Sequence, residues 1–71
     1  MEKIKVQSGR ILSFKYAGVL VRGRVEQVIS SHAFIRLHKD FTSNAGKLHK
    51  EGEKVLFQVR LMEDIKLHDE Y

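Results

Sequence analysis

The sequence predicts an all-β protein: a small five-stranded barrel that forms a single domain over residues 1–71. Apolar and polar residues alternate in several short runs, which is the pattern of half-buried strands. Glycine interrupts these runs at Gly18 and Gly23, as it does where a strand turns or bends sharply. A chain of 71 residues without cysteine has one modest core and no disulfide, so packing alone must stabilise it.

The first two strands are expected over residues 11–16 and 19–29, and Ala17-Gly18 supplies the turn between them. The residues expected on the inward side are Leu12, Phe14, Tyr16, Val19, Val21, Gly23 and Val25. The outward residues of the second strand are Leu20, Arg22, Arg24 and Glu26. We expect Gly23 at a bend where a side chain would clash with another backbone.

A third strand is expected over residues 32–38, after a three-residue loop, Ser30-Ser31-His32. Because residues directly opposite each other share a side of the sheet, this loop determines which outward residues meet. The expected pairs are Ile29 with Ala33, Val28 with Phe34, Glu26 with Arg36, Val25 with Leu37 and Arg24 with His38. With these pairs the polar side chain of Gln27 points toward the core, which is unfavourable. A bulge near Val28 would turn it away.

The remaining third of the chain is predicted to complete the barrel. Residues 40–52 are rich in turn-forming residues and predict a long irregular loop. A fourth strand is expected over residues 54–61, where β-branched and aromatic residues occupy alternate positions, and a short fifth over 65–67 closes the barrel. The predicted core consists of Leu12, Phe14, Val19, Val21, Val25, Ile35, Leu37, Val55, Phe57, Val59 and Ile65.

Three spaced motifs cover residues 9–37 and resemble the KOW-type SH3-like small barrel. They are Gly9-x-Ile11-x-x-Phe14-x-Tyr16-x-Gly18, Gly23-x-Val25-x-x-Val28 and Ala33-x-Ile35-x-Leu37. The pattern is particularly similar to small barrel proteins of unassigned role in Gram-positive bacteria. KOW modules contact RNA or other proteins, so the resemblance implies a bacterial binding module and leaves its ligand open.

A second set of residues is similar to the OB-fold repeat of the large RNA-binding ribosomal protein. It comprises Gly23-x-Val25, residues 32–37 and residues 51–59. His32 stands where that family has glycine, and the middle strand of the repeat has no clear counterpart in residues 40–50. An OB-like barrel is therefore the alternative to the SH3-like one.

Positive charge is concentrated in the first part of the chain. Residues 1–50 carry ten Lys and Arg against three acids, whereas residues 51–71 carry three against six. This asymmetry permits a polyanionic partner, although net charge also serves solubility. The candidate nucleic-acid-binding residues combine phosphate-pairing guanidinium groups with a ring on which a base can stack; they are Arg22, Arg24, Phe34, Arg36 and His38.

A structural interpretation of the same residues competes with the functional one. In it, Phe34 covers one end of the core, Arg36 pairs with Glu26 across the strands, and Arg24 only keeps the face solvated. The sequence alone does not separate the two interpretations.

No enzymatic, metal or cofactor site is predicted. Histidines at positions 32, 38, 49 and 68 lack the spacing of zinc ligands, and no glycine-rich nucleotide motif is present. No apolar run approaches the roughly 20 residues that span a bilayer, and the N-terminus lacks a secretory signal. We therefore expect a cytoplasmic module that binds RNA or single-stranded DNA and does not bind a membrane. The alternative is an SH3-like protein-interaction module that docks a partner chain on a sheet edge or on Phe34.

Overall fold

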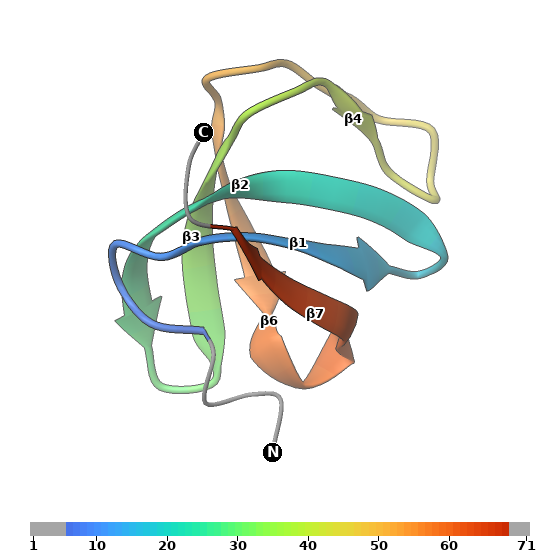
Figure 1. Ribbon diagram of the computed structural model, residues 1–71. Helices are drawn as coiled ribbons and strands as arrows, with labels where there is room; N and C mark the ends of the chain where they lie inside the picture. Colours follow the sequence, from blue (N-terminus) through green and yellow to red (C-terminus); the bar gives the residue numbers. More distant parts are fainter. Residues whose placement is uncertain (1–5, 69–71) are drawn as a thin grey trace.

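The computed structural model describes residues 6–68, and within them the protein is all-β, as predicted. It contains no α-helix in that range. The elements in chain order are β1 (Ile11–Tyr16), β2 (Val19–Ile29), β3 (His32–Leu37), β4 (Phe41–Thr42), β5 (Leu48–His49), β6 (Lys54–Gln58), the 3₁₀ turn η2 (Val59–Leu61) and β7 (Met62–His68). Figure 1 shows how the long, curved β2 spans the molecule between β1 and the β4 region.

Five strands form one antiparallel sheet in the order β6-β3-β2-β1-β7, and β4 and β5 pair separately. The edge strands β6 and β7 follow each other in the chain through η2 (Figure 1). Within the described residues these two strands are not paired with each other, so the sheet does not close into a barrel. The predicted five strands are present, whereas the predicted closure is not seen.

The β1–β2 turn has the predicted position and a backbone suited to it. Ala17 and Gly18 both have positive φ, 52° and 82°. Two such residues make the tight turn whose twist matches that of the flanking strands. This hairpin places Leu12, Phe14 and Val21 in the core, each with no exposed surface.

The β2–β3 hairpin differs from its prediction in loop length and register. Its loop has two residues, because Ile29 pairs with His32 and Ser30 adopts a left-handed backbone with φ of 53°. A bulge lies between Val25 and Gln27, rather than near Val28. The observed pairs are Gly23 with Leu37, Arg24 with Arg36, Val25 with Ile35, Gln27 with Phe34, Val28 with Ala33 and Ile29 with His32. The shorter loop and the bulge together return Val25 and Ile35 to the core side, where both are fully buried.

Residues 40–52 are not an irregular loop, because they contain the small β4–β5 ribbon. Phe41 pairs with His49, and their rings stack with centroids 5.7 Å apart. The turn is held by a hydrogen bond from the Ser43 amide to the Lys47 carbonyl, and Gly46 has φ of 86°. Phe41 is buried against Phe57, so the ribbon covers part of the core.

The last strands also differ from their predicted bounds. β6 ends at Gln58, and the residues expected to continue it form η2 instead. β7 begins at Met62 and is longer than the predicted 65–67. The Val59 amide donates to the Ser31 carbonyl at 2.9 Å, which anchors η2 to the β2–β3 turn. Met62 is completely buried and pairs with Tyr16.

The core lies on one side of the sheet and is centred on aromatic rings. Phe57 packs edge-on against Phe14 and Tyr16, with ring centroids 5.2 and 4.8 Å apart. The predicted core residues Leu12, Phe14, Val21, Val25, Ile35, Leu37, Phe57 and Ile65 are buried, and Val19, Val55 and Val59 are partly buried against them. The prediction missed Val6, Ile11, Ala33, Phe41 and Met62.

Gly23 occupies the close approach that was predicted for it. A Cβ atom built there would overlap the Arg36 carbonyl oxygen and lie 2.7 Å from Ile35 Cγ2. Glycine at this position lets β2 lie against β3 while both strands curve.

Candidate nucleic-acid interface

Three basic side chains form a row across the solvent side of β2, β3 and β6. The register pairs Arg24 with Arg36 and Arg36 with Lys54, and residues directly opposite share a side of the sheet. We call Arg24, Arg36 and Lys54 the cationic row. Like charges placed directly opposite each other destabilise a sheet, so the row is unfavourable for folding by itself.

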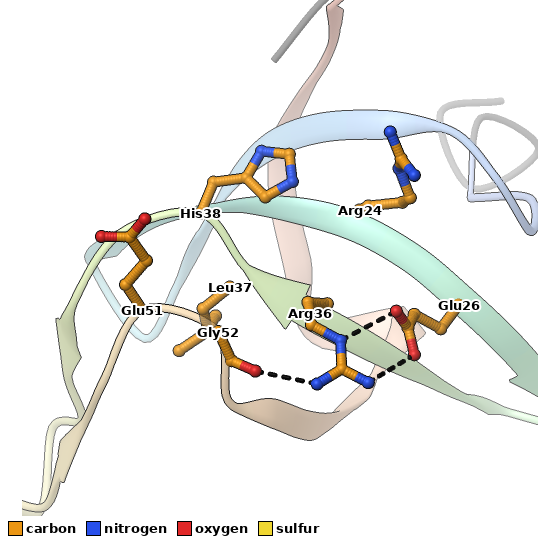
Figure 2. Close-up of a pocket in the computed structure, with 7 residues that line it drawn as sticks. All are labelled: Arg24, Glu26, Arg36, Leu37, His38, Glu51 and Gly52. Carbon is orange, nitrogen blue, oxygen red and sulfur yellow. Dashed lines mark hydrogen bonds and ion pairs between the residues drawn. The ribbon is translucent and has the colours of Figure 1, made fainter.

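Arg36, the middle member of the row, is held by three hydrogen bonds (Figure 2). Its Nε and Nη2 donate to the two carboxylate oxygens of Glu26 at 2.8 and 3.0 Å, and Nη1 donates to the Gly52 carbonyl at 2.8 Å. The hydrogen bonds between Arg36 and Glu26 lower the pKa of Glu26 and raise that of Arg36. Arg36 therefore links the β2 bulge to the turn before β6, as the structural interpretation of its pairing with Glu26 expected. Glu26 reaches it from the bulge and not from the directly opposite position.

A depression of about 590 Å³ lies beside this ion pair and brings several candidates together. Its lining consists of Arg24, Glu26, Arg36, Leu37, His38, Glu51 and Gly52. Arg24 is exposed and extends away from the Arg36–Glu26 pair, on the same side as His38 (Figure 2). Burial lowers the pKa of His38, the positive charges of Arg24 and Arg22 add to that shift, and Glu51 opposes it. His38 is therefore mainly neutral at neutral pH.

Phe34 lies next to the row without lining this depression. It is two residues from Arg36 on β3, it is half-buried, and it pairs with Gln27 and Leu56. The ammonium nitrogen of Lys54 is 5.3 Å from its ring centroid, within the range of a cation–π contact. One aromatic ring and one cation are thus presented together at the surface.

Arg22 belongs to a neighbouring part of the same face. It pairs with Ser13 on β1 and lines a second depression of about 610 Å³, which we call the lateral groove. The lateral groove is lined by Ser13, Lys15, Leu20, Arg22, Lys39, Asp64, Ile65, Lys66 and His68. The five predicted residues are therefore not gathered in one depression: Arg24, Arg36 and His38 share the first, and Arg22 lies in the second.

The residues predicted for the site did not include Lys54, Lys39 or Lys66. The alternation of β6 does place Lys54 opposite the buried Phe57 side of that strand, which is a readable signal. Its position beside Arg36 depends on the pairing of β6 with β3, and that pairing is a long-range feature. Lys39 lies in the segment after β3, and Lys66 lies in β7, which is longer than predicted.

Within residues 6–68, no group of three His, Cys, Asp or Glu side chains is placed to hold a metal ion. No helix in that range has the length and hydropathy to cross a membrane. No family model matches the chain, and comparison with curated proteins and with solved structures found no match. The geometry of the outer face is therefore the basis for assigning a function.

Proposed function

We propose that this protein is a small nucleic-acid-binding module that holds RNA or single-stranded DNA on the outer face of β2, β3 and β6. The observation that carries the proposal is the cationic row beside the half-buried Phe34. Three like charges in register oppose folding. Glu26 forms an ion pair with the middle one, Arg36, and its charge also attracts Arg24 and Lys54, which form no ion pair of their own among the described residues. The phosphate groups of a nucleic acid would supply negative charge to pair with the outer members of the row, Arg24 and Lys54.

Each residue has a distinct role in this proposal. Arg24 and Lys54 pair with backbone phosphates, and the Phe34 ring stacks on a base. Arg36 acts mainly as a positioning residue, because its guanidinium is held by Glu26 and Gly52. Stacking contributes roughly 1–3 kcal/mol per base, so one ring and a few cations give weak, salt-sensitive binding with Kd of roughly 10⁻⁴ to 10⁻⁶ M.

We also infer that the strand arrangement is SH3-like and of the KOW type, with the sheet left open between β6 and β7. The glycine hairpin, the strand containing Gly23 and its alternating partner follow one another as β1, β2 and β3. The OB-like alternative lacks support in residues 40–50, where the strands are the two-residue β4 and β5.

The proposal is tested by fluorescence titration of a labelled, mixed-sequence single strand at low salt. Three proteins are compared: the wild type, the row variant Arg24→Gln/Lys54→Gln and the control variant Lys47→Gln/Arg60→Gln. Both variants lose two positive charges, but Lys47 and Arg60 are exposed residues outside the outer-face depressions. We expect measurable binding by the wild type, a marked loss in the row variant and a much smaller loss in the control variant. Equal losses in the two variants would mean that binding follows net charge and not this face.

A protein-interaction module is the alternative function, and one observation favours it. An apolar depression of about 270 Å³ lies between the β4–β5 ribbon and the sheet, lined in part by Tyr16, Phe41, Val55, Leu56 and Phe57. Leu48 and Leu56 are both about half exposed nearby. Absence of nucleic-acid binding by the wild type at low salt would favour docking of a partner chain at this depression.

A further inference from the structure

The lateral groove is a second basic surface, and it is built mainly from β1, β2 and β7. Four cations line it, Lys15, Arg22, Lys39 and Lys66, together with the Ser13 hydroxyl and the His68 ring. Asp64 is the one acid among the described residues that line it. The groove therefore has an excess of positive charge in a concave surface, where the fields of neighbouring cations add.

Asp64 is directed toward one side of the groove by an irregularity in β7. The β1–β7 register shifts between Ser13 and Lys15, and Asp64 has a left-handed backbone with φ of 53°. Its carboxylate lies 3.9 Å from Lys15 Nζ, and both side chains are largely exposed, so this ion pair is weak. A bulge with an unfavourable backbone often re-aims a side chain at a functional surface.

The lateral groove also carries the Ser13 hydroxyl and the His68 imidazole among its cations. The register aligns Arg22, Ser13 and Lys66 across three strands, so these side chains share the outer face. Ser13 Oγ and His68 Nε2 are hydrogen-bonded at 2.9 Å, which fixes the hydroxyl and the ring relative to each other. Hydroxyl and imidazole groups flanked by Lys and Arg are suited to phosphate oxygens.

The lateral groove is continuous with the cationic row. Arg22 and Arg24 are two residues apart on β2 and lie on the same side of the strand. The His38 amide donates to the Arg22 carbonyl at 2.9 Å, which places the His38-Lys39 segment beside Arg22. His38 lines the first depression and Lys39 lines the groove, so these consecutive residues connect the two surfaces.

We propose that the lateral groove binds backbone phosphates of the same nucleic-acid strand that contacts the cationic row. This inference rests on the proposed function and extends it: the strand crosses from β6 over β3 and β2 to β1 and β7. Neighbouring strands of a sheet are about 4.8 Å apart, so the path spans roughly 19 Å from β6 to β7. Such a path fits a site of several nucleotides, within the range of about 4–16 found for small single-strand-binding domains.

The experiment adds a groove variant, Lys39→Gln/Lys66→Gln, to the wild type, row and control variants defined above. Affinity for a labelled single strand of about 16 nucleotides is measured at several salt concentrations. The slope of log K against log salt is negative, and each lost phosphate contact on a single strand reduces its magnitude by about 0.7. The slope of the groove variant should therefore be smaller in magnitude than that of the wild type by about 1.4. Lys39 and Lys66 are exposed. A circular dichroism melt that matches the wild type would confirm that the variant is folded.

The outcomes separate this inference from the proposed function. A flattened slope in both the row and groove variants, with the control variant close to wild type, supports a continuous path. A flattened slope in the groove variant alone removes the row from the interface and contradicts both the continuous path and the proposed function. If the row variant is affected and the groove variant behaves as wild type, the groove inference fails and the proposed function stands. If the wild type does not bind at low salt, both fail.

A competition experiment distinguishes a nucleic-acid backbone from a small phosphate ligand. Sodium phosphate and sodium chloride are compared as competitors for the labelled strand at equal ionic strength. We expect the two salts to weaken wild-type binding to a similar extent, because a strand makes many contacts and one phosphate makes few. Much stronger competition by phosphate that disappears in the groove variant would identify a small-anion site and overturn the inference.

Discussion

The two sides of the sheet are stabilised in different ways. On the inner side, Leu12, Phe14 and Phe57 are almost completely buried and fix each other by packing. On the outer side, Arg24, Arg36 and Lys54 stand directly opposite one another, and the interactions around Arg36 offset their repulsion only in part. The inner side has the residues that a stable sheet needs. The outer side also has two cations, Arg24 and Lys54, that folding alone does not require, which is why we propose a function there.

The contrast is sharpest at adjacent residues of β6, because Phe57 is buried and Leu56 is half exposed. Phe57→Ala should cost about 3–5 kcal/mol, the usual loss for a buried aromatic side chain and comparable with the whole stability of a domain of this size. Leu56→Ala should cost much less. Thermal melts of both variants measure the difference, and equal melting temperatures would show that Phe57 is not part of the core.

Gly23 tests whether β2 and β3 approach each other as closely as the structure indicates. Gly23→Ala places a methyl group against the Arg36 carbonyl and Ile35, and the overpacking should cost about 1–3 kcal/mol. Gly46→Ala meets no neighbouring atom, but φ of 86° makes alanine strained there, at about 1–2 kcal/mol. Gly23→Ala should therefore be the more harmful in chemical denaturation. A smaller effect at Gly23 than at Gly46 would contradict the close approach.

Arg36 and Arg24 should respond oppositely to loss of charge. Arg36→Gln breaks the bonds to Glu26 and Gly52, and we expect a lower melting temperature. Arg24→Gln removes a like charge opposite Arg36, and we expect an unchanged or slightly higher melting temperature at low salt. Added salt should diminish that gain by screening the repulsion. Destabilisation by Arg24→Gln of the same size as that by Arg36→Gln would mean that Arg24 also supports the fold.

His38 should give a small pH dependence of stability. Because burial lowers its pKa in the folded state, the unfolded chain takes up the proton first as pH falls below about 6.5. Stability should then decline until the pH passes below the folded-state pKa. The pKa values of Glu26 and Glu53 are lowered from 4.5, so their stabilisation is lost at more acidic pH. Melts across the histidine range should show less decline for His38→Gln, and an identical decline would contradict this assignment.

The predictable features were mainly local ones. Alternation identified β1, β2 and β3, and the Ala17-Gly18 turn and the constraint at Gly23 were correct. The β2–β3 register was wrong because the left-handed backbone of Ser30 and the position of the bulge depend on packing across the whole sheet. Burial of Phe41 was missed for a similar reason, since it depends on contact with Phe57 rather than on alternation near Phe41.

The candidate site was predictable in composition and less so in arrangement. The two-residue spacing correctly placed Arg22 on the same side of β2 as Arg24, and Phe34 on the same side of β3 as Arg36. The ion pair between Arg36 and Glu26 was also predicted. The cationic row and the lateral groove were not, because both depend on strands that pair over long sequence separations. Lys54 enters through β6, and Lys66 enters through β7.

The salt dependence of binding to a mixed-sequence single strand tests the central claim most directly. For the wild type, log K should fall linearly with log salt as counterions are released. The row variant Arg24→Gln/Lys54→Gln should reduce the magnitude of this slope by about 1.4. Phe34→Ala should instead weaken binding at every salt concentration with little change in slope, because stacking releases no ions. If the row variant keeps the wild-type slope, or if Phe34→Ala leaves the affinity unchanged, the outer face of β2, β3 and β6 is not a nucleic-acid interface of the proposed kind.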